Sequence, residues 1–528
     1  MKFPLPAHAD RRVLVVWLLL SLAVVALALP TVRETGLDYD EAVYGHLAKD
    51  FLTNRQCEQH MPGSQSLEIA GRPFPIFVQG YLGAVKCWLL LPSFAFFGTS
   101  IAVMRWTMLV WALIGVLALM LWTGRTLGVW PAVTTGFLLV LDPAFFFPTI
   151  CEWGAFVPSF FCRCAGLLCL LLWWRQRRLI WMVLAGATFG IGFLNKIDFF
   201  VVLLALASAA VVTKPRELLA RLRAHWPHWL AGAGAFVLTS FPMLLNLVKW
   251  AREVLAVQTG VRTGEFATKL KVAKAVLDGS YFHRLMESGG VFARMFEQTT
   301  AGWPIFGVVL VAAVGVLVLY AVRDERAKAR SWSMFLLSGF GVATCGWLLL
   351  PDAVRVHHAL LVYPFPQLLL AAAAARLFRT GLGKVIGAFA LTAVFSTQVV
   401  NIWRTQQFIA STGGRGAWSS ALADFAGEVR DRDDVLLVSF DWGFHEQLSF
   451  LTDAPRRFEP TWNLQEGKPV ELLPDPRCFY LIHPPEFSVF DYGAKYLARA
   501  RAENPQLEVQ SRTNREGRVV FQVFRFVK

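Results

Sequence analysis

Long apolar runs separated by short polar segments fill the first 400 or so residues of the chain. Most of them approach the roughly 20 residues that a helix needs to cross the hydrocarbon core of a bilayer. The pattern predicts eleven membrane-spanning helices, at Val13–Leu29, Ile101–Trp122, Val129–Leu141, Ala155–Trp173, Leu179–Leu194, Phe199–Val212, Trp229–Val248, Trp303–Val322, Trp332–Leu350, Ala359–Leu377 and Val385–Ile402. The chain is therefore predicted to be a polytopic α-helical membrane protein.

The composition agrees with this class. Of 528 residues, 55% are hydrophobic and only 17% are charged, and the mean hydropathy is +0.48, which is too apolar for a soluble protein of this length. The first apolar run follows Arg11 and Arg12, as in a signal peptide. Because ten further spans follow, a retained anchor is the preferred interpretation.

Basic residues predict the orientation. If the N-terminus is cytoplasmic and the spans alternate, the short inner segments hold 18 Lys and Arg residues but only four acids, Asp10, Glu217, Asp324 and Glu325. An excess of Lys and Arg is typical of cytoplasmic loops. The net charge of +14 is then mainly a topology signal, and nucleic acid is not predicted as a partner. The loops 30–100 and 249–302 and the C-terminus are predicted to lie outside.

The apolar segment Phe77–Phe97 is long enough to span, but counting it would place every later basic cluster outside. We therefore expect it to be interfacial or re-entrant. Residues 411–528 change character: strand-like "DDVLLVSFD", "CFYLIH" and "RVVFQVFRF" alternate with helix-like "WSSALADFAGEVR" and "YGAKYLARARA". They predict a small α/β domain after a membrane domain of residues 1–410, and the sequence assigns no chemistry to it.

The cysteines show neither a CxxC pair nor a Cys/His zinc spacing. Cys151, Cys162, Cys164 and Cys169 are expected to be buried small hydrophobes. A Cys57–Cys87 disulfide is an open alternative if that loop lies outside the cytoplasm.

Two adjacent acids, Asp40 and Glu41, follow the first span and begin an amphipathic helix. One interpretation is structural: Asp40 caps the helix and Glu41 interacts with its dipole. The other is chemical, because both acids lie within about ten residues of the outer end of a span, where a site open to lipid and water could form.

Further ionisable residues are predicted at the same side of the membrane. Glu152 lies between two spans, in "LDPAFFFPTICEWG". Lys196 and Asp198 occupy the tip of a hairpin whose arms of about 16 and 14 residues reach only roughly 21–24 Å, so this pair is expected to lie at membrane depth, either as a functional group or as a self-neutralised pair.

A cation cluster, Arg355, His357 and His358, follows at the outer end of a later span and suits an anion. Arg105 is expected to snorkel towards water from its span. Arg262, Lys269, Lys271 and Lys274 are expected to form a solvated face. Acids and cations at one side of a membrane match the transfer of a sugar from a polyprenyl phosphate, in which a carboxylate removes the acceptor's proton and cations stabilise the leaving phosphate.

The stretch "LDYDEAVYGHLAKDF" resembles the Asp-Glu motif in the first outer loop of the GT-C glycosyltransferases, including the family 39 protein O-mannosyltransferases and the bacterial lipid A aminoarabinose transferases. "LDPAFFFPTICEWG", "GFLNKIDFF" and "HHALLVYPFPQL" are similar to stretches of bacterial family 39 members. The resemblance covers about residues 10–405. It implies a GT-C fold with interfacial helices in the first outer loop and an inverting transfer from a lipid-phosphate-linked sugar.

By motif position Asp40 would be the general base, and Glu41 would orient it or hold a metal. Glu152 stands where the family pattern has an Asp, and Lys196 matches the lysine at the tip of the later hairpin, which makes it a candidate phosphate contact. Some members use a divalent metal and others do not, so no cofactor is assigned. The predicted partners are a polyprenyl-phosphate sugar, an envelope acceptor and the bilayer of a bacterial inner membrane, with the site facing the periplasm.

Two alternatives remain open at this stage. A transporter or flippase could line its path with the same charges, but such proteins often show internal repeats, and no clear repeat is found here. An inactive envelope-assembly scaffold could bind lipid carriers at the same place.

Overall fold

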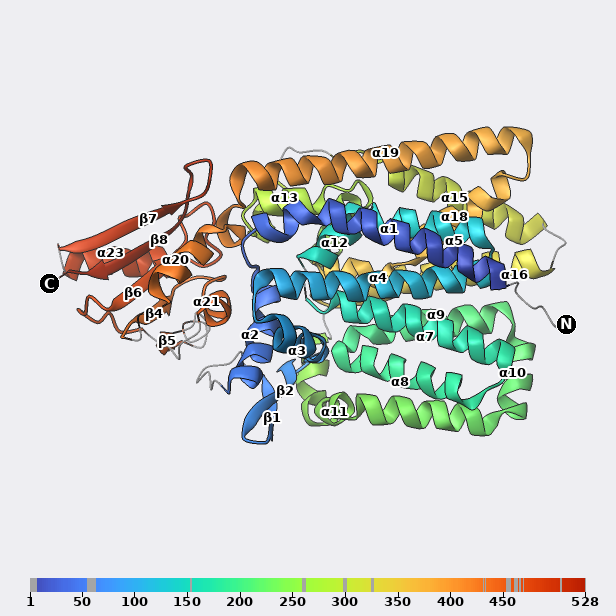
Figure 1. Cartoon of the computed structure of the whole chain (residues 1–528), viewed down its shortest axis with the longest axis horizontal. Coiled ribbons are helices and arrows are strands. Elements are labelled where there is room, and N and C mark those ends of the chain that lie inside the picture. Colours follow the sequence, from blue (N-terminus) through green and yellow to red (C-terminus); the bar gives the residue numbers. More distant parts are fainter. Residues whose placement is uncertain are drawn as a thin grey trace.

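The computed structural model describes residues 7–54, 63–151, 154–258, 263–297, 302–323, 327–430, 432, 434–452, 457–459, 464, 467–468, 470–503 and 506–527. Long helices run roughly side by side along one axis (Figure 1). They coincide with the predicted apolar runs and are α1 (Ala7–Glu34), α4 (Ile101–Thr126), α5 (Val129–Val140), α7 (Phe156–Gln176), α8 (Leu179–Asn195), α9 (Phe200–Thr213), α11 (Trp226–Gln258), α15 (Ile305–Arg323), α16 (Ala327–Leu349), α18 (Phe365–Leu377) and α19 (Gly381–Thr412).

The number of spans is less definite than their positions. Seven described helices are long and apolar enough to cross a membrane, or ten if each of three bent helix pairs counts as one span. These pairs join α5 to α6 (Pro143–Ile150), α9 to the basic helix α10 (Pro215–Ala224), and α17 (Val356–Ala359) to α18. Helix α8 has only 17 residues. A helix is thus present at each of the eleven predicted positions, but the count of eleven spans stays a prediction.

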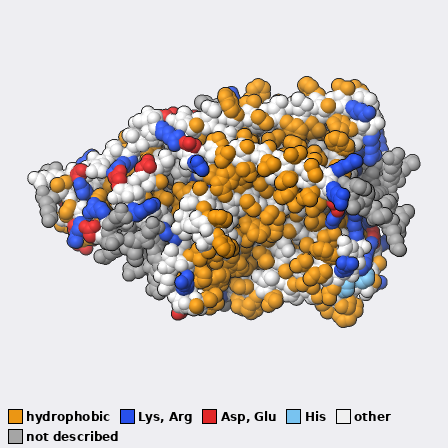
Figure 2. Space-filling model, in the orientation of Figure 1, with side chains coloured by type: hydrophobic (Ala, Val, Ile, Leu, Met, Phe, Trp, Pro, Cys, Tyr) orange, Lys and Arg blue, Asp and Glu red, His pale blue; other side chains and the backbone are white. Residues whose placement is uncertain are grey.

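Apolar side chains cover the outside of this bundle. Figure 2 shows them as a broad band over the helices, with Lys and Arg gathered at the end opposite the C-terminal region. Leu238 on α11, Val311 on α15 and Phe389 on α19 are each at least 74% exposed. Large exposed apolar surfaces mark contact with other apolar matter, and for helices of this length that surface is lipid. The protein is an integral membrane protein.

The first loop of the bundle contains helix α2 (Tyr39–Thr53), strands β1 (Gln65–Ile69), β2 (Arg72–Gln79) and β3 (Leu82–Gly83), and helix α3 (Val85–Phe97). The apolar segment predicted to be interfacial is therefore the end of an antiparallel sheet followed by a 13-residue helix. Helices α2 and α3 lie at the end of the bundle from which the C-terminal region projects, while the start of α1 lies at the other end (Figure 1).

The second loop contains helices α12 (Thr263–Leu277), α13 (Tyr281–Glu287) and α14 (Phe292–Met295). The expectation of a solvated basic face is wrong for Lys269, which is 1% exposed and donates to the carbonyls of Leu348, at 3.0 Å, and Leu350. Lys269 therefore connects α12 to carbonyl groups at the end of α16. Arg262 lies outside the described residues.

The C-terminal region has the predicted α/β character. Five strands form a sheet in the order β5-β4-β6-β8-β7, in which β4 (Leu436–Ser439) pairs in parallel with β5 (Arg457–Glu459) and β6 (Cys478–Ile482). Strand β8 (Val519–Phe526) runs antiparallel to β6 and to β7 (Leu507–Thr513). The predicted helices are α20 (Ala421–Val429) and α23 (Tyr492–Glu503), and the sequence analysis missed β5, β7 and α21 (His445–Leu451).

The Cys57–Cys87 disulfide that the sequence left open is not tested, because Cys57 lies outside the described residues. Cys87 is buried, and its thiol donates to the carbonyl of Tyr44 at 3.3 Å. Cys151, Cys162 and Cys164 are buried as expected, while Cys169 is partly exposed.

Candidate functional site

Three acids, Asp38, Asp40 and Glu41, lie at the start of α2, and they make different contacts there. Asp38 is the N-cap, and its carboxylate accepts from the backbone N–H of Asp40 at 3.1 Å. Glu41 completes a capping box by accepting from the backbone N–H of Asp38 at 3.2 Å. The interpretation of Asp40 as the helix cap is therefore wrong, because Asp38 does that work two residues earlier.

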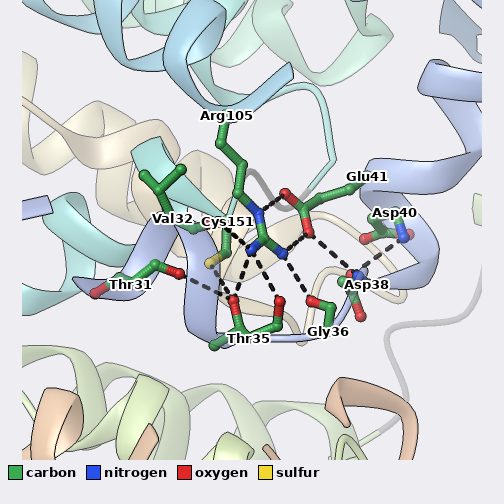
Figure 3. Close-up of polar contacts among 9 residues, drawn as sticks. All are labelled: Thr31, Val32, Thr35, Gly36, Asp38, Asp40, Glu41, Arg105 and Cys151. Carbon is green, nitrogen blue, oxygen red and sulfur yellow. Dashed lines mark hydrogen bonds and ion pairs between the residues drawn. The ribbon is translucent and has the colours of Figure 1, made fainter. Parts of the chain in front are cut away.

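A buried arginine fixes Glu41. Figure 3 shows Arg105 of α4 between the end of α1 and the start of α2. Its guanidinium donates to Oε1 of Glu41 at 2.9 Å and to Oε2 at 2.7 Å, and to the carbonyls of Val32, Thr35 and Gly36 at 2.7–3.1 Å. Arg105 is 0% exposed, so the expectation that it snorkels towards water is wrong. It is held inside by the carbonyls and the carboxylate that accept its N–H groups.

Asp40 differs from its neighbours because it is partly exposed, whereas Asp38 and Glu41 are 7% and 1% exposed. Its negative charge acts on two tyrosines from other elements. The pKa of Tyr81 is raised to about 12 by burial of the hydroxyl and by the charges of Asp40 and Asp198, although the side chain as a whole is 47% exposed. Burial and the charge of Asp40 also raise the pKa of Tyr281, to about 12.

The tip of the α8–α9 hairpin carries a charge cluster as predicted. Lys196 Nζ lies 3.1 Å from Asp198 Oδ2, which lies 3.2 Å from His358 Nδ1. Lys196 Nζ is also 3.4 Å from the same histidine nitrogen. Lys196 and Asp198 are 7% and 6% exposed. The structure therefore brings together two segments separated by 160 residues, and it confirms the Lys–Asp pairing that the sequence left as an alternative.

Backbone contacts join this tip to the first loop. Leu82 and Lys196 form an isolated antiparallel bridge, and the Ile197 N–H donates to the carbonyl of Tyr81 at 3.4 Å. Glycine is required where the two pass: a Cβ on Gly83 would lie 2.1 Å from the carbonyl oxygen of Leu194. Tyr81, Asp198 and Lys196 are consequently held beside one another.

The third part of the site precedes α18. Arg355 precedes α17, and its guanidinium lies 4.3 Å from the ring centroid of Phe292. The rings of His357 and His358 are 4.2 Å apart. The backbone N–H of Val356 donates to the hydroxyl of Tyr281 at 3.2 Å. Tyr281, whose pKa is raised in part by the charge of Asp40, therefore also contacts this segment.

A second buried arginine, Arg163 of α7, holds the end of the same segment. Its guanidinium donates to the carbonyls of Leu360, Leu361 and Tyr363 at 2.8, 3.2 and 2.5 Å. Arg163 is 2% exposed. The sequence analysis passed over it in "CRC". The acid side and the histidine side of the site are thus each anchored by an arginine inside the bundle, through backbone carbonyls that no pattern of residue types reveals.

Glu152 lies outside the described residues, so its predicted position is not tested. Of its neighbours, Cys151 contacts the hydroxyl of Thr35 at 3.4 Å, and a Cβ on Gly154 would lie 3.5 Å from the ring of His357.

Comparison with known proteins identifies the fold. Residues 84–244 match the sequence model of the family described as "Dolichyl-phosphate-mannose-protein mannosyltransferase". ArnT from Cupriavidus metallidurans bound to undecaprenyl phosphate is similar over 97% of both chains, with 16% identity and a TM-score of 0.51. Its apo state is similar over 96% of this chain and 97% of that one, with 17% identity and a TM-score of 0.51. The chain has a GT-C fold.

An archaeal structure supports the same conclusion. The alignment with the apo oligosaccharyltransferase of Archaeoglobus fulgidus covers 89% of this chain and 69% of the archaeal chain, with 13% identity and a TM-score of 0.52. No curated protein matches the chain in sequence. The GT-C fold that the sequence resemblance implied is therefore confirmed.

Within this GT-C fold, the sequence analysis missed two buried lysines. Lys86 of α3 is 0% exposed, and its ammonium lies 4.8 Å from the ring centroid of Tyr44 on α2. Lys49, at the other end of α2, is 2% exposed and donates to the carbonyls of Phe450 and Thr452 at 2.8 and 2.6 Å. The burial of Lys86 could have been predicted, because it stands inside the apolar run "AVKCWLLLP". The burial of Lys49 could not, because its partners lie about 400 residues later in the chain.

Among the described residues, no group of three or more His, Cys, Asp or Glu side chains is arranged to hold a metal ion. Both carboxylate oxygens of Glu41 already accept hydrogen bonds from Arg105. The predicted option that Glu41 holds a metal therefore receives no support from its surroundings.

Proposed function

We propose that this protein transfers a sugar from a polyprenyl-phosphate-linked donor to an envelope acceptor, with inversion at the transferred carbon. The observation that carries the proposal is the arrangement of the site. A partly exposed carboxylate, Asp40, and the carboxylate of Asp198 both lie near enough to Tyr81 for their charges to act on its hydroxyl, and Asp198 is paired with Lys196 and His358. The GT-C fold and the undecaprenyl phosphate named for the ArnT structure support a lipid-phosphate donor.

The proposed step is a single displacement. The acceptor oxygen attacks the anomeric carbon while its proton passes to Asp40 as general base. The bond to the phosphate oxygen breaks on the opposite face, and its electrons leave with the phosphate. Lys196, Arg355, His357 and His358 supply positive charge or N–H donors at that side. Attack opposite the leaving group inverts the configuration.

Glu41 takes a positioning role in this proposal. Its contacts with Arg105 and with the Asp38 backbone fix the first turn of α2. Because the turn is fixed, Asp40 is presented at the end of the bundle rather than inside it. Fixed geometry of this kind removes part of the entropic cost of reaction. Glu152 is kept as a third candidate acid, and a divalent metal as a candidate cofactor, with no step assigned to either.

The proposed location is the bacterial inner membrane, with the site and residues 411–528 in the periplasm and residues 1–410 forming the membrane domain. The 18-to-4 excess of basic residues in the predicted inner segments supports this orientation. The site and the C-terminal region lie at the same end of the bundle, as this topology requires (Figure 1).

Two rival functions use the same charges differently. A flippase would carry the lipid-linked sugar across the bundle, and a scaffold would hold the lipid without chemistry. The ionisable side chains of the candidate site lie at one end of the bundle rather than along a path through it, which favours the enzyme over the flippase. Purified protein incubated with polyprenyl phosphate sugars and envelope extracts should add one sugar mass to an acceptor, detected by mass spectrometry. Movement of intact donor between leaflets without any new product would support the flippase instead.

A further inference from the structure

The C-terminal region is docked directly on the helix that carries Asp40. Helix α21 packs along α2, and the ring of Trp442 lies 4.0 Å from that of Tyr39, the residue before Asp40. At the other end of the contact, Lys49 holds the carbonyls of Phe450 and Thr452. Both ends of α2 are therefore attached to residues more than 390 positions later in the chain.

One ionisable side chain of α21 lies inside this contact. Glu446 is 2% exposed, and its carboxyl group is hydrogen-bonded to the Tyr39 hydroxyl. Its Oε1 is buried without a hydrogen-bond partner among the described residues. A buried carboxylate left with an unmet oxygen costs free energy, whereas a protonated carboxyl group in the same place carries no charge.

Resting on the function proposed above, we propose that Glu446 is a positioning residue for transfer: in its protonated form it holds Tyr39 and the first turn of α2, so that Asp40 is correctly placed only while the C-terminal region is docked. No covalent step involves Glu446. The sequence assigned no chemistry to the C-terminal region, which becomes part of the working site through Glu446.

The surroundings of Glu446 agree with a protonated group. Burial, and to a smaller extent the charge of Asp40, raise the pKa of Glu446 to about 8, although the hydrogen bond with the Tyr39 hydroxyl acts in the opposite direction. The titratable groups of α2 that face it are Tyr39 and Asp40; on α20, which also packs on α21, Asp424 and Glu428 are exposed. Ionisation would add a second negative charge beside Asp40 and weaken the hold of α21 on α2.

The direction of the pH effect follows from this shift. The folded state binds the Glu446 proton more tightly than the unfolded state, whose pKa is near the ordinary 4.5. The protonated carboxyl group of Glu446 therefore stabilises the folded state. This stabilisation is fully present below about pH 4.5 and is lost as the pH rises through about 8. Transfer by the wild-type protein should decline over the upper part of the same range.

Three full-length variants test the inference. Glu446→Gln keeps the size and cannot ionise, and Glu446→Ala removes the contact. Glu428→Gln is the control, because Glu428 is exposed and forms an ion pair with Arg512 in the same region. Glu446→Ala should lower kcat about tenfold or more, leave the KM for the lipid donor near normal, and increase amide hydrogen exchange in the first turn of α2. Glu446→Gln should lose the decline in transfer near pH 8 and the matching loss of Tm.

Two results would overturn the inference. One is a decline in transfer and Tm near pH 8 that is the same in Glu446→Gln as in the wild type. The other is exchange in α2 that is as slow in Glu446→Ala as in Glu428→Gln. If the wild-type protein transfers no sugar, the proposed function fails on its own, and the exchange and Tm measurements still decide whether Glu446 holds α2.

Discussion

Arg105 and Glu41 form a two-pronged ion pair inside the protein, with Nε–Oε1 and Nη2–Oε2 distances of 2.9 and 2.7 Å. Neither side chain is more than 1% exposed. Asp40, the residue directly before Glu41, is partly exposed. Two adjacent carboxylates therefore lie in different surroundings, one buried in an ion pair that joins α2 to α4 and the other partly exposed.

The first prediction concerns that ion pair. Glu41→Gln should destabilise the fold by about 3–5 kcal/mol, because it leaves the Arg105 charge buried without its partner. Protein that still folds should keep most of its turnover. Thermal unfolding in detergent measures the first effect and transfer per folded molecule the second. A Glu41→Gln protein that is as stable as the wild type but inactive would show that Glu41 acts in the chemistry.

The second prediction concerns the close passage between the first loop and the hairpin. Gly83→Ala should displace Lys196, because the added Cβ would lie 2.1 Å from the Leu194 carbonyl oxygen. We expect a loss of about 1–3 kcal/mol in stability and weaker use of the lipid donor. Gly80→Ala is the matched control, since the nearest atom to its Cβ would be 3.8 Å away. Equal behaviour of the two variants would contradict the account of this contact.

The third prediction assigns Lys196 to the donor phosphate. Lys196→Ala should raise the KM for the lipid donor at least tenfold while the protein still folds, because an ammonium at this depth gains most from an anion. Lys214→Ala, at an exposed lysine paired with Glu217 by the basic helix α10, is the control. Unchanged donor kinetics in Lys196→Ala would leave the contact with Asp198 as a purely structural pair.

Hydropathy and charge predicted the membrane class, the helix positions and the α/β character of the C-terminal region, because those features depend on composition within short windows. The motif around Asp40 was visible for the same reason. The N-cap was misassigned by two residues, since Asp38 and Asp40 are both good caps and only the backbone of α2 distinguishes them.

The parts that the sequence did not reveal are contacts between distant segments. Arg105 was expected to reach water, but its partners are carbonyls of the α1–α2 connection, which residue type does not show. Lys49 and Glu446 look like surface residues of amphipathic helices until α21 is placed on α2. Each needs a partner from a remote part of the chain, and no local pattern predicts such a pair.

The fourth prediction concerns orientation. A reporter active only in the cytoplasm should be silent when fused after Lys528 and active when fused after Arg223, in the basic helix α10. The reason is the excess of Lys and Arg at that end of the bundle. Activity after Lys528 together with silence after Arg223 would reverse the assignment of sides and place the site in the cytoplasm.

The central claim is that Asp40 is the general base, and Asp40→Asn tests it most directly. Because Asp38 caps α2, the substitution leaves the cap in place and removes a favourable charge near the helix start, worth about 0.3–1 kcal/mol. Glu34→Gln, an acid-to-amide change in a salt bridge with Arg515 at the same end of the molecule, is the control. The measurement is the transfer rate at saturating donor, with donor binding checked separately.

The account predicts that Asp40→Asn folds, binds the lipid donor as the wild type does, and loses on the order of a hundredfold or more in turnover, while Glu34→Gln keeps its turnover. Transfer by Asp40→Asn at a rate near that of the wild-type protein would contradict it.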